Sequence, residues 1–192
     1  MRVEVGVLAL QGDFREHAAA LVRLGADPVL VRRVGDLCGL QALILPGGES
    51  TTIGMLAERY GLMDDLREAI GGGLPTLGTC AGMVLLASGT TSETEQPQLR
   101  VLDVVVERNA FGRQVDSFEA DLAVAGLDGP IHAVFIRAPW IDKAGAGVET
   151  LAQWGGHPVM VRQGKILATS FHPELTGDLR LHRLLLDMGR ER

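Results

Sequence analysis

The sequence lacks most of the features that mark secreted, membrane-spanning or nucleic-acid-binding proteins. Its 192 residues include two cysteines, too few for a disulfide framework, so we expect a reducing compartment. No apolar run approaches the roughly 20 residues that a membrane-spanning helix needs. The apolar start, MRVEVGVLAL, alternates with charge and has no small-residue cleavage pattern, so it predicts a first strand rather than a signal peptide. We therefore expect a cytoplasmic protein that does not bind a membrane.

Basic residues are also scarce relative to acidic ones. The chain has 18 Lys and Arg against 24 Asp and Glu, which gives a net charge of −6. Because phosphate binding needs clustered Lys and Arg, this balance argues against a nucleic-acid partner and favours a small polar metabolite or a protein surface. The length and a hydrophobic content of 46% suit one domain over residues 1–192, large enough to bury a core without disulfides.

What the sequence does have, in its first half, is an alternation of apolar runs and amphipathic segments. The apolar runs predict strands over residues 3–10, 28–31, 42–45 and 74–78. Between them, the pattern predicts helices over residues 13–24, from 51 or 52 onward, 62–70 and 81–87. Asp13 and either Thr51 or Thr52 are the candidate N-caps. Near-continuous apolar strands that alternate with helices are typical of a parallel sheet covered on both faces.

The second half changes character after a polar stretch at residues 88–98. Strand-like composition with short links predicts strands over residues 101–107, 117–122, 131–136, 148–154, 159–163 and 166–170, and an amphipathic closing helix over 179–188. We therefore expect the α/β class, as a single domain with an open, mostly parallel sheet flanked by helices and an antiparallel or mixed extension.

The segment GTCAGM places a cysteine between two glycines where a predicted strand gives way to a helix. Gly78 and Gly82 give it the G-x-nucleophile-x-G form of a strained strand-to-helix turn, in which larger side chains would clash. Such a turn puts the Cys80 sulfur at a helix N-terminus, which favours thiolate, and aims the Ala81 N–H at a developing oxyanion. Because a lone cysteine is often an inert core residue, this motif by itself leaves both interpretations of Cys80 open.

A histidine and a carboxylate follow the last predicted strand, in the segment SFHPE. In an extended segment residues i and i+2 face the same side, so His172 and Glu174 project together, with Pro173 restricting the backbone between them. Glu174 can accept from one ring nitrogen, fix the tautomer and leave the other nitrogen facing a thiol. With Cys80, this gives the nucleophile, base and orienter of acyl transfer, and together the two segments favour catalysis.

The remaining cysteine and histidines lack such a setting. A histidine outside a motif is usually a solvated side chain. We therefore interpret Cys38 as structural and give the solvated interpretation to the other histidines, His17, His132, His157 and His182.

The segment LPGGEST follows the predicted strand at 42–45. Two glycines after a strand can expose consecutive N–H groups as an anion-binding concavity, in which Gly48 would supply a second oxyanion donor. The alternative is a glycine turn before a capped helix. The segment lacks the Gly-Lys-Ser/Thr ending of a phosphate-binding loop, so nucleotide binding is not expected. We expect no cofactor and no metal.

Together these segments resemble the class I glutamine amidotransferases, which use a Cys–His–Glu triad. The chain is more closely similar to the glutaminase subunits of pyridoxal 5′-phosphate synthases. This similarity extends over nearly the whole chain, in VLALQGDFREH, LPGGESTT, GTCAGM, VVVERNAFGRQVDSFEADL, FIRAP and SFHPEL. The cysteine and His-x-Glu segments are shared across the superfamily, whereas ERNAFGRQVDSFE carries the narrower resemblance.

The resemblance implies a glutaminase in which Cys80 is the nucleophile, His172 the acid and base, and Glu174 its orienter. The N–H groups of Gly48 and Ala81 would form the oxyanion hole. Hydrolysis of L-glutamine would pass through a cysteine thioester and release L-glutamate and ammonia.

The family's glutamine-binding positions fall on Gly48, Glu49, Ser50, Arg108, Ile136 and Arg137. The guanidinium of Arg108 or Arg137 suits the α-carboxylate of glutamine. For Glu49, a role of the backbone and a role of the side chain both stay open. Without the resemblance, we would interpret the segment RNAFGR as a solvated strand and turn.

The resemblance also implies a partner, a barrel-shaped synthase subunit in a hetero-oligomer that takes the ammonia for pyridoxal 5′-phosphate (vitamin B6) biosynthesis. Gln11, after the first strand, is expected near both the oxyanion loop and the docking surface. The alternatives are an amidotransferase subunit serving a different synthase, a cysteine hydrolase or stress protein on a similar sheet, and a non-catalytic docking subunit. Many of those cysteine hydrolases carry histidine after the cysteine, where this chain has Ala81, and the intact triad disfavours a non-catalytic subunit.

Overall fold

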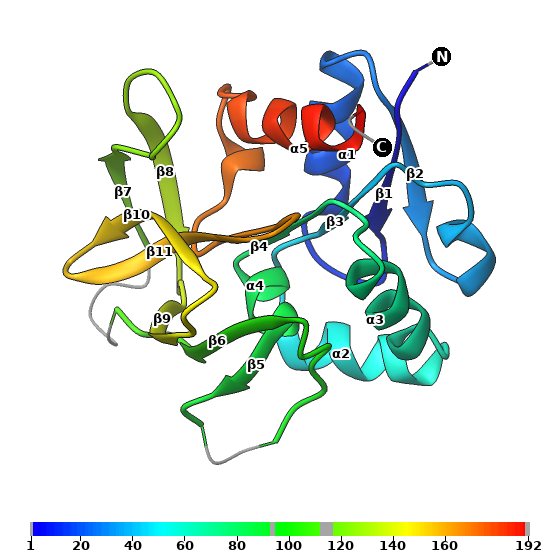
Figure 1. The fold of residues 1–192 in the computed structure, drawn as a ribbon, viewed down its shortest axis with the longest axis horizontal. Coiled ribbons are helices and arrows are strands. Elements are labelled where there is room, and N and C mark those ends of the chain that lie inside the picture. The colour runs from blue at the N-terminus through cyan, green and yellow to red at the C-terminus, as the bar shows by residue number, and fades with distance from the viewer. Residues whose placement is uncertain (1, 93–94, 112–116, 191–192) are drawn as a thin grey trace.

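The computed structural model describes residues 2–92, 95–111 and 117–190, and at its centre lies a seven-stranded sheet (Figure 1). The strand order is β10-β11-β12-β4-β3-β1-β2. These strands are β1 (Glu4–Leu8), β2 (Asp27–Val31), β3 (Ala42–Leu45), β4 (Thr76–Thr79), β10 (Glu149–Trp154), β11 (His157–Gln163) and β12 (Ile166–Thr169). The strands from β2 to β12 pair in parallel, whereas β11 and β10 add an antiparallel edge. The predicted α/β class with a mostly parallel sheet and an antiparallel extension is confirmed.

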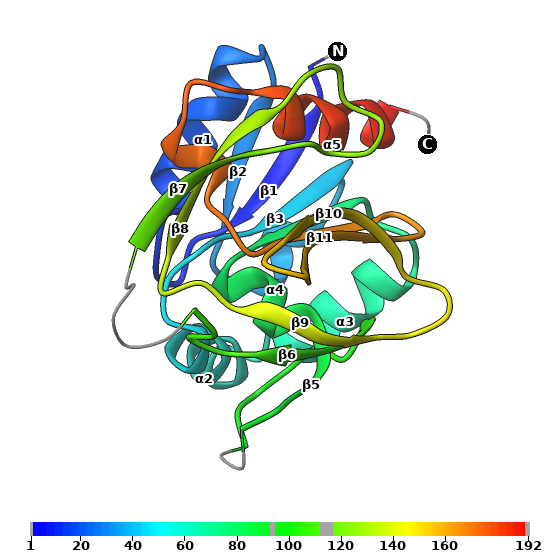
Figure 2. The ribbon, with the colours of Figure 1, turned by 90° about the vertical axis from the view of Figure 1, so that its left-hand side faces the viewer.

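Helices and two small sheets cover the faces of the central sheet (Figure 2). One face packs against α1 (Phe14–Arg23), α5 (Arg180–Arg190) and the hairpin of β7 (Ser117–Leu122) and β8 (Ile131–Ile136). The other packs against α2 (Ser50–Arg59), α3 (Met63–Gly71), α4 (Ala81–Leu86) and the sheet of β5 (Ala87–Thr90), β6 (Leu102–Glu107) and β9 (Trp140–Ala144). Among the described residues, no helix has both the length and the apolar character to cross a membrane.

Strand β3 shows how a short apolar run contributes side chains to the cores on both faces of the central sheet. All four of its residues are buried. Leu43 and Leu45 belong to the core under α2, α3 and α4, whereas Ala42 and Ile44 belong to the core under α1 and α5. Because successive side chains of a strand point to opposite faces, a strand covered on both faces needs an uninterrupted apolar run.

The sequence did not predict strands β5 and β9. Their sequences, ASGT and WIDKA, contain small and charged residues instead of an apolar run. Both pair with β6, β5 in parallel and β9 antiparallel. Pairing with a neighbour, rather than intrinsic composition, therefore makes these segments strands.

The two predicted helix caps are wrong in part. Helix α2 begins at Ser50, and its N-cap is Glu49, whose carboxylate accepts the N–H groups of Thr51 at 3.1 Å and Thr52 at 2.7 Å. Neither threonine caps the helix. Asp13 does occupy the N-cap position of α1, but its side chain makes no capping hydrogen bond.

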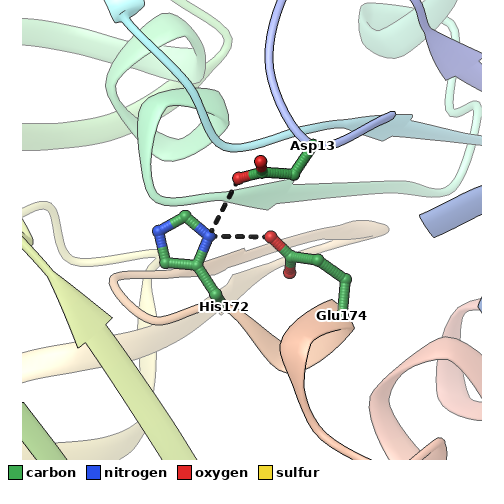
Figure 3. Close-up of side chains that lie close together, drawn as sticks. All are labelled: Asp13, His172 and Glu174. Atoms are coloured by element: carbon green, nitrogen blue, oxygen red, sulfur yellow. Dashed lines mark hydrogen bonds and ion pairs between the residues drawn. The ribbon is translucent and has the colours of Figure 1, made fainter. Parts of the chain in front are cut away.

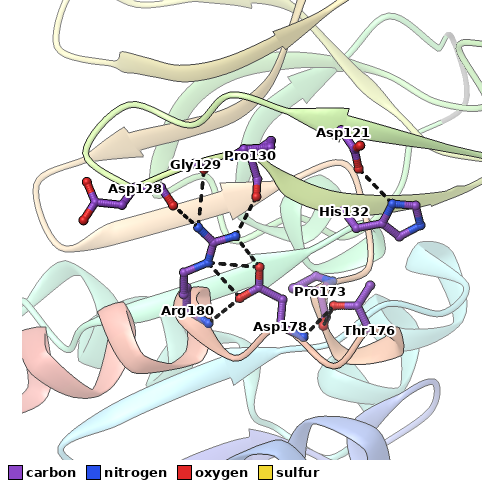
Figure 4. Close-up of polar contacts among 9 residues, drawn as sticks. All are labelled: Asp121, Asp128, Gly129, Pro130, His132, Pro173, Thr176, Asp178 and Arg180. Atoms are coloured by element: carbon purple, nitrogen blue, oxygen red, sulfur yellow. Dashed lines mark hydrogen bonds and ion pairs between the residues drawn. The ribbon is translucent and has the colours of Figure 1, made fainter.

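The turn of the β7–β8 hairpin is fixed to α5 by Arg180, the first residue of that helix (Figure 4). The guanidinium donates to the carbonyls of Asp128, Gly129 at 3.3 Å and Pro130 at 2.7 Å. It also pairs with Asp178 at 2.6 Å, which holds the pKa of that carboxyl below its ordinary value. Arg180 thereby holds in place a hairpin whose other end reaches the cavity described next.

Candidate active site

The carboxyl ends of four neighbouring strands, β12, β4, β3 and β1, meet at one edge of the central sheet. The segments that follow them line a cavity of about 370 Å³, at the edge where ligands bind in open α/β sheets. The lining residues are Gln11, Asp13, Gly48, Glu49, Ser50, Cys80, Ala81, Val84, Arg108, Asn109, Ile136, Arg137, Pro139 and His172. The cavity thus brings together every site residue predicted from the sequence except Glu174, which lies behind His172. A larger hollow of about 740 Å³ beside β5 contains none of them.

Cys80 lies on the sharp turn between β4 and α4, in a backbone conformation that side chains rarely adopt, with φ of 48°. Its N–H donates to the carbonyl of Thr169 at 2.7 Å, which fixes the turn to the neighbouring strand β12. A Cβ atom at Gly82 would lie 2.0 Å from the carbonyl oxygen of Leu45, and one at Gly78 would lie 2.8 Å from the carbonyl carbon of Gly82. The strained, crowded elbow that the glycines predict is therefore present.

His172 and Glu174 meet through Nδ1 and Oε1 at 2.7 Å (Figure 3). Both side chains are buried. The local conformation differs from the predicted extended one, because Pro173–Leu175 forms a single 3₁₀ turn. The turn brings the carboxylate of Glu174 back to the ring, while the His172 N–H bonds to the carbonyl of Val134 on β8 at 2.9 Å.

The neighbours of His172 set its charge. Burial alone would lower the pKa of His172, but interactions with Asp13, Cys80 and Glu174 raise this pKa to about 12. Burial also raises the pKa of Glu174, against the opposing effect of its hydrogen bond to His172. The Nε2 atom of His172 is buried without a hydrogen-bond partner among the described residues. The site therefore holds an imidazolium beside Cys80, with one ring nitrogen left for a reacting group.

Asp13 is a site residue that sequence reasoning missed. Its Oδ2 lies 3.4 Å from His172 Nδ1, the nitrogen that also meets Glu174 (Figure 3). Its backbone N–H donates to the carbonyl of Gly47 at 3.0 Å, which joins the start of α1 to the loop after β3. An acidic residue after a first strand was the available signal, but it fits an N-cap equally well.

Two histidines that we interpreted as solvated, His17 and His182, are instead fully buried next to the site. His17 Nδ1 lies 2.9 Å from His182 Nε2. His17 Nε2 lies 3.1 Å from Thr79 Oγ1 and 3.3 Å from Glu174 Oε2. Burial lowers the pKa of His17 well below its ordinary value and that of His182 to about 4, so both rings are neutral at pH 7. The signal that could have found His17 is its place on the apolar stripe of α1 with Leu21.

The other residues that we interpreted as lying outside any motif are His132, His157 and Cys38. His132 is a surface side chain, as expected, between Glu119 at 2.7 Å and Asp121 at 3.0 Å. His157 is partly buried and stacks on Trp140 with ring centroids 3.7 Å apart. Cys38 is exposed, at the end of a short 3₁₀ turn. None of the three borders the cavity.

Gln11 packs against the glycine loop that follows β3. Its Oε1 accepts the N–H of Glu49 at 2.8 Å, and a Cβ atom at Gly48 would lie 2.5 Å from the same oxygen. The carbonyl of Gly47 accepts the N–H of Asp13. Because a trans peptide is planar, with its C=O and N–H on opposite sides, the N–H of Gly48 points away from Asp13. The structure thus places Gln11 against this loop, while its relation to a partner stays a prediction.

The carboxylate of Glu49 is occupied by the chain itself. It caps α2 and accepts a further hydrogen bond from the hydroxyl of Thr52 at 2.7 Å. Partial burial would raise the pKa of Glu49, but the hydrogen bonds from Thr52 and Thr51 outweigh it and lower the pKa to about 2. This use of the side chain favours a backbone role for Glu49 toward a ligand.

Arg108 is held by a network that sequence reasoning did not find. Its guanidinium donates to Glu49 Oε1 at 3.1 Å and to Gln96 Oε1 at 2.8 Å. The same oxygen of Gln96 accepts the hydroxyls of Ser50 and Thr51, both at 3.2 Å. Gln96 comes from the polar stretch between the two halves, where no motif marked it. The network fixes Arg108 at the cavity wall, beside the N-terminus of α2.

The end of β8 brings Ile136 and Arg137 to the cavity. The carbonyl oxygen of Ile136 lies 4.0 Å from Cys80 Sγ. Arg137 has φ of 41° and Asn109 has φ of 50°, both in the left-handed region that is sparsely populated outside functional sites and turns. Residues 112–116 of the segment ERNAFGRQVDSFE lie outside the described residues.

Asp13, His172 and Glu174 are also the group of described residues whose atoms could hold a metal ion, with one ligand atom from each within 4.8 Å of the others. A histidine ligand must be neutral, however, and here the neighbours hold His172 protonated. The arrangement therefore suits the sharing of a proton better than the binding of a metal. The absence of a metal from the function stays a prediction.

A cysteine on a strained elbow, an imidazole at the same cavity and a carboxylate on the far ring nitrogen have the arrangement of a triad-type cysteine hydrolase site. The comparison with known families narrows this class. The chain belongs to the SNO glutamine amidotransferase family, whose model matches residues 7–191.

Curated relatives are similar over nearly the full length. The pyridoxal 5′-phosphate synthase subunit PdxT of Thermus thermophilus is 62% identical over 190 residues, which cover 98% of this chain and 99% of that protein. The protein of the same name from Parafrankia sp. is 61% identical over 188 residues, 97% of this chain and 93% of that protein.

Solved structures agree with the fold. A crystal structure of a glutamine amidotransferase superposes with a TM-score of 0.93 at 59% identity, covering 97% of this chain and 98% of that one. A second glutamine amidotransferase, from Thermotoga maritima and only 14% identical, superposes with a TM-score of 0.61 over the whole of this chain and 92% of that one. The fold therefore extends to far more distant sequences.

Proposed function

We propose that this chain is the glutaminase subunit of a pyridoxal 5′-phosphate synthase, which hydrolyses L-glutamine and passes on the ammonia. The observation that carries the proposal is the convergence of Cys80 and His172 on one cavity, with Glu174 on the far nitrogen of the imidazole. The identity of the synthase is taken from the names of the relatives above, which match nearly the whole of this chain.

In the first half of the reaction, the Cys80 thiolate attacks the side-chain amide carbon of glutamine. The oxygen of that amide becomes an oxyanion, which the N–H groups of Gly48 and Ala81 stabilise. Two observations support these donors. The N–H of Gly48 points away from Asp13, and the N–H of Ala81 is the first of α4, which has no acceptor within the helix.

His172 moves the protons in both halves of the reaction. As an imidazolium it donates a proton to the leaving nitrogen, and the tetrahedral intermediate collapses to a γ-glutamyl thioester and ammonia. The now neutral imidazole takes a proton from water, whose oxygen attacks the thioester and releases glutamate and the Cys80 thiolate. Glu174 on Nδ1 keeps Nε2 as the nitrogen that exchanges protons with substrate and water.

The cavity also offers groups for the amino-acid end of glutamine. The two guanidinium groups of Arg108 and Arg137 border it, and a guanidinium fork suits an α-carboxylate. Arg108 is already oriented by Gln96 and Glu49, so its binding geometry is set before the ligand arrives. Ser50 and the backbones of Gly48, Glu49 and Ile136 complete the proposed binding set.

A partner subunit follows from the chemistry of the product. Ammonia released into water is protonated and loses its nucleophilicity, so it is useful only when handed directly to an acceptor. The proposed acceptor is the synthase subunit, with Gln11, beside the oxyanion loop, near the docking surface. The protein is proposed to act in the cytoplasm.

The test is glutamate release from glutamine, measured with and without the synthase subunit. We expect release by the complex, and a loss of at least about 10³-fold in the Cys80→Ala variant, because removal of a triad nucleophile removes most of the rate enhancement. The matched control is Cys38→Ala, which replaces the exposed cysteine and should keep wild-type activity. An equal loss in both variants would contradict the proposal.

A pull-down tests the narrower assignment. In the presence of glutamine, the chain should bind the synthase subunit. If it hydrolyses glutamine but binds no such subunit, it serves a different acceptor.

A further inference from the structure

Two carboxylates converge on one ring nitrogen of this site, and the triad uses only one of them. Glu174 Oε1 lies 2.7 Å and Asp13 Oδ2 3.4 Å from His172 Nδ1 (Figure 3). We propose that Asp13 is a second positioning residue, which orients the imidazole together with Glu174 and accepts the Nδ1 hydrogen in its place when Glu174 cannot. This inference rests on the proposed glutaminase function.

The reason for a shared role is that Nδ1 carries a single hydrogen. Glu174, at 2.7 Å, accepts that hydrogen in the structure. Asp13, at 3.4 Å, lies just outside the usual range of N–H···O distances and would have to approach by only ~0.5 Å. Asp13 therefore acts on the ring through its charge in the wild-type protein and through a hydrogen bond once Glu174 is replaced.

The carboxylate of Asp13 has no second hydrogen-bonding role among the described residues. Its carboxylate makes no cap of α1, and among the described residues it has no ion-pair or hydrogen-bond partner besides His172. Its backbone is fixed by the 3.0 Å hydrogen bond to the carbonyl of Gly47. A Cβ atom at Gly47 would lie 2.8 Å from His172 Nδ1 and 3.0 Å from Asp13 Oδ2, so the absence of a side chain there leaves room for both groups.

The two carboxylates differ in a way that makes them complementary. The side chain of Glu174 is fully buried, and its second oxygen lies 3.3 Å from the ring of His17. The side chain of Asp13 is 37% exposed and lines the cavity. Glu174 is thus a fixed acceptor, whereas Asp13 has the freedom to approach the ring and keeps contact with solvent.

The test is a double-mutant cycle of Asp13→Asn and Glu174→Gln, measured as glutaminase kcat and KM in the complex with the synthase subunit. Each single variant leaves one carboxylate to orient the ring, and the double variant leaves none. We expect each single change to lower kcat with little effect on KM, and the double variant to fall at least about tenfold below the product of the two single effects.

A second measurement distinguishes an orienting role of Asp13 from a purely structural one. The titratable groups that face the imidazole are Cys80, Glu174, Asp13 and, behind Glu174, His17. Removing the charge of Asp13 should shift the limb of the kcat/KM profile that reports His172 to lower pH. Asp142→Asn, which removes an exposed carboxylate of β9, is the matched control and should leave this limb in place.

The outcomes are distinct. Multiplicative effects of the two changes, or a kcat and pH profile of Asp13→Asn equal to those of the control, would overturn the role of Asp13. Thermal unfolding of each variant identifies a loss that comes from misfolding, and Asp13→Glu, which restores the carboxylate, should recover part of kcat. If the wild-type complex itself releases no glutamate, the proposed function fails, and not only this inference.

Discussion

Gly47 is a residue whose lack of a side chain leaves room for the imidazole of the candidate site. Its φ lies outside the left-handed region, so its backbone tolerates a side chain. A Cβ atom there would nevertheless lie 2.4 Å from Cε1 of His172, whose own backbone is fixed to β8 by the hydrogen bond to Val134. Gly47 is therefore required by the position of the imidazole and not by its backbone conformation.

We predict that Gly47→Ala lowers kcat by about 100-fold or more, because displacing a catalytic group by about 1 Å has that effect. The midpoint of thermal unfolding should change little. Gly71→Ala, in a helix with no atom near the added methyl, is the matched control and should keep full activity. Wild-type kcat in Gly47→Ala would show that the imidazole can occupy another position.

At the scale of single residues, sequence motifs predicted the three residues of the triad. Cys80 was marked by its glycines, and His172 with Glu174 by their spacing. Asp13 and Gln96 have no such mark, because each acts through contacts with residues far away in the chain. His17 was misjudged since its burial depends on α1 packing against α5, which a motif does not show.

At the scale of elements, the buried pair of His17 on α1 and His182 on α5 joins two helices behind the site. Both rings are neutral when folded, whereas in the unfolded chain they titrate near pH 6.5. The unfolded state therefore binds more protons below that pH, and stability falls as the pH decreases. His172, whose folded pKa is raised, acts oppositely, since its contribution is complete below pH 6.5 and is lost toward pH 12.

We predict that the free energy of unfolding decreases between pH 7 and pH 4, and that His182→Gln reduces this decrease. A change in the pKa of His182 from about 6.5 to about 4 corresponds to ~3 kcal/mol. Urea unfolding of both proteins at several pH values measures the difference. Parallel curves for the two proteins would contradict the buried, neutral state of His182.

The elements themselves were predictable where a single segment carries its own pattern. The apolar strands of the parallel sheet, such as β3, need no partner to be recognised. Strands β5 and β9 do, since only pairing with β6 makes them regular. The 3₁₀ turn after His172 was missed because Pro173 fits both an extended segment and the first position of a helical turn.

At the scale of the whole molecule, the site exists because the topology puts β12, β4, β3 and β1 side by side. Cys80 and His172 are far apart in the sequence and come together because β4 and β12 are neighbours in one parallel sheet. The alternation of strands and helices predicted the class of this sheet. It could not predict the strand order, which arises from pairing between segments far apart in the chain.

The most direct test of the account is to trap the covalent intermediate on the chain in its complex with the synthase subunit. The complex is mixed with glutamine, quenched in acid during turnover, digested, and analysed by mass spectrometry. The account predicts a γ-glutamyl group on the peptide that contains Cys80, none on the peptide that contains Cys38, and none in the Cys80→Ala variant. Glutamate release at the wild-type rate by Cys80→Ala, or an adduct on another residue, would contradict it.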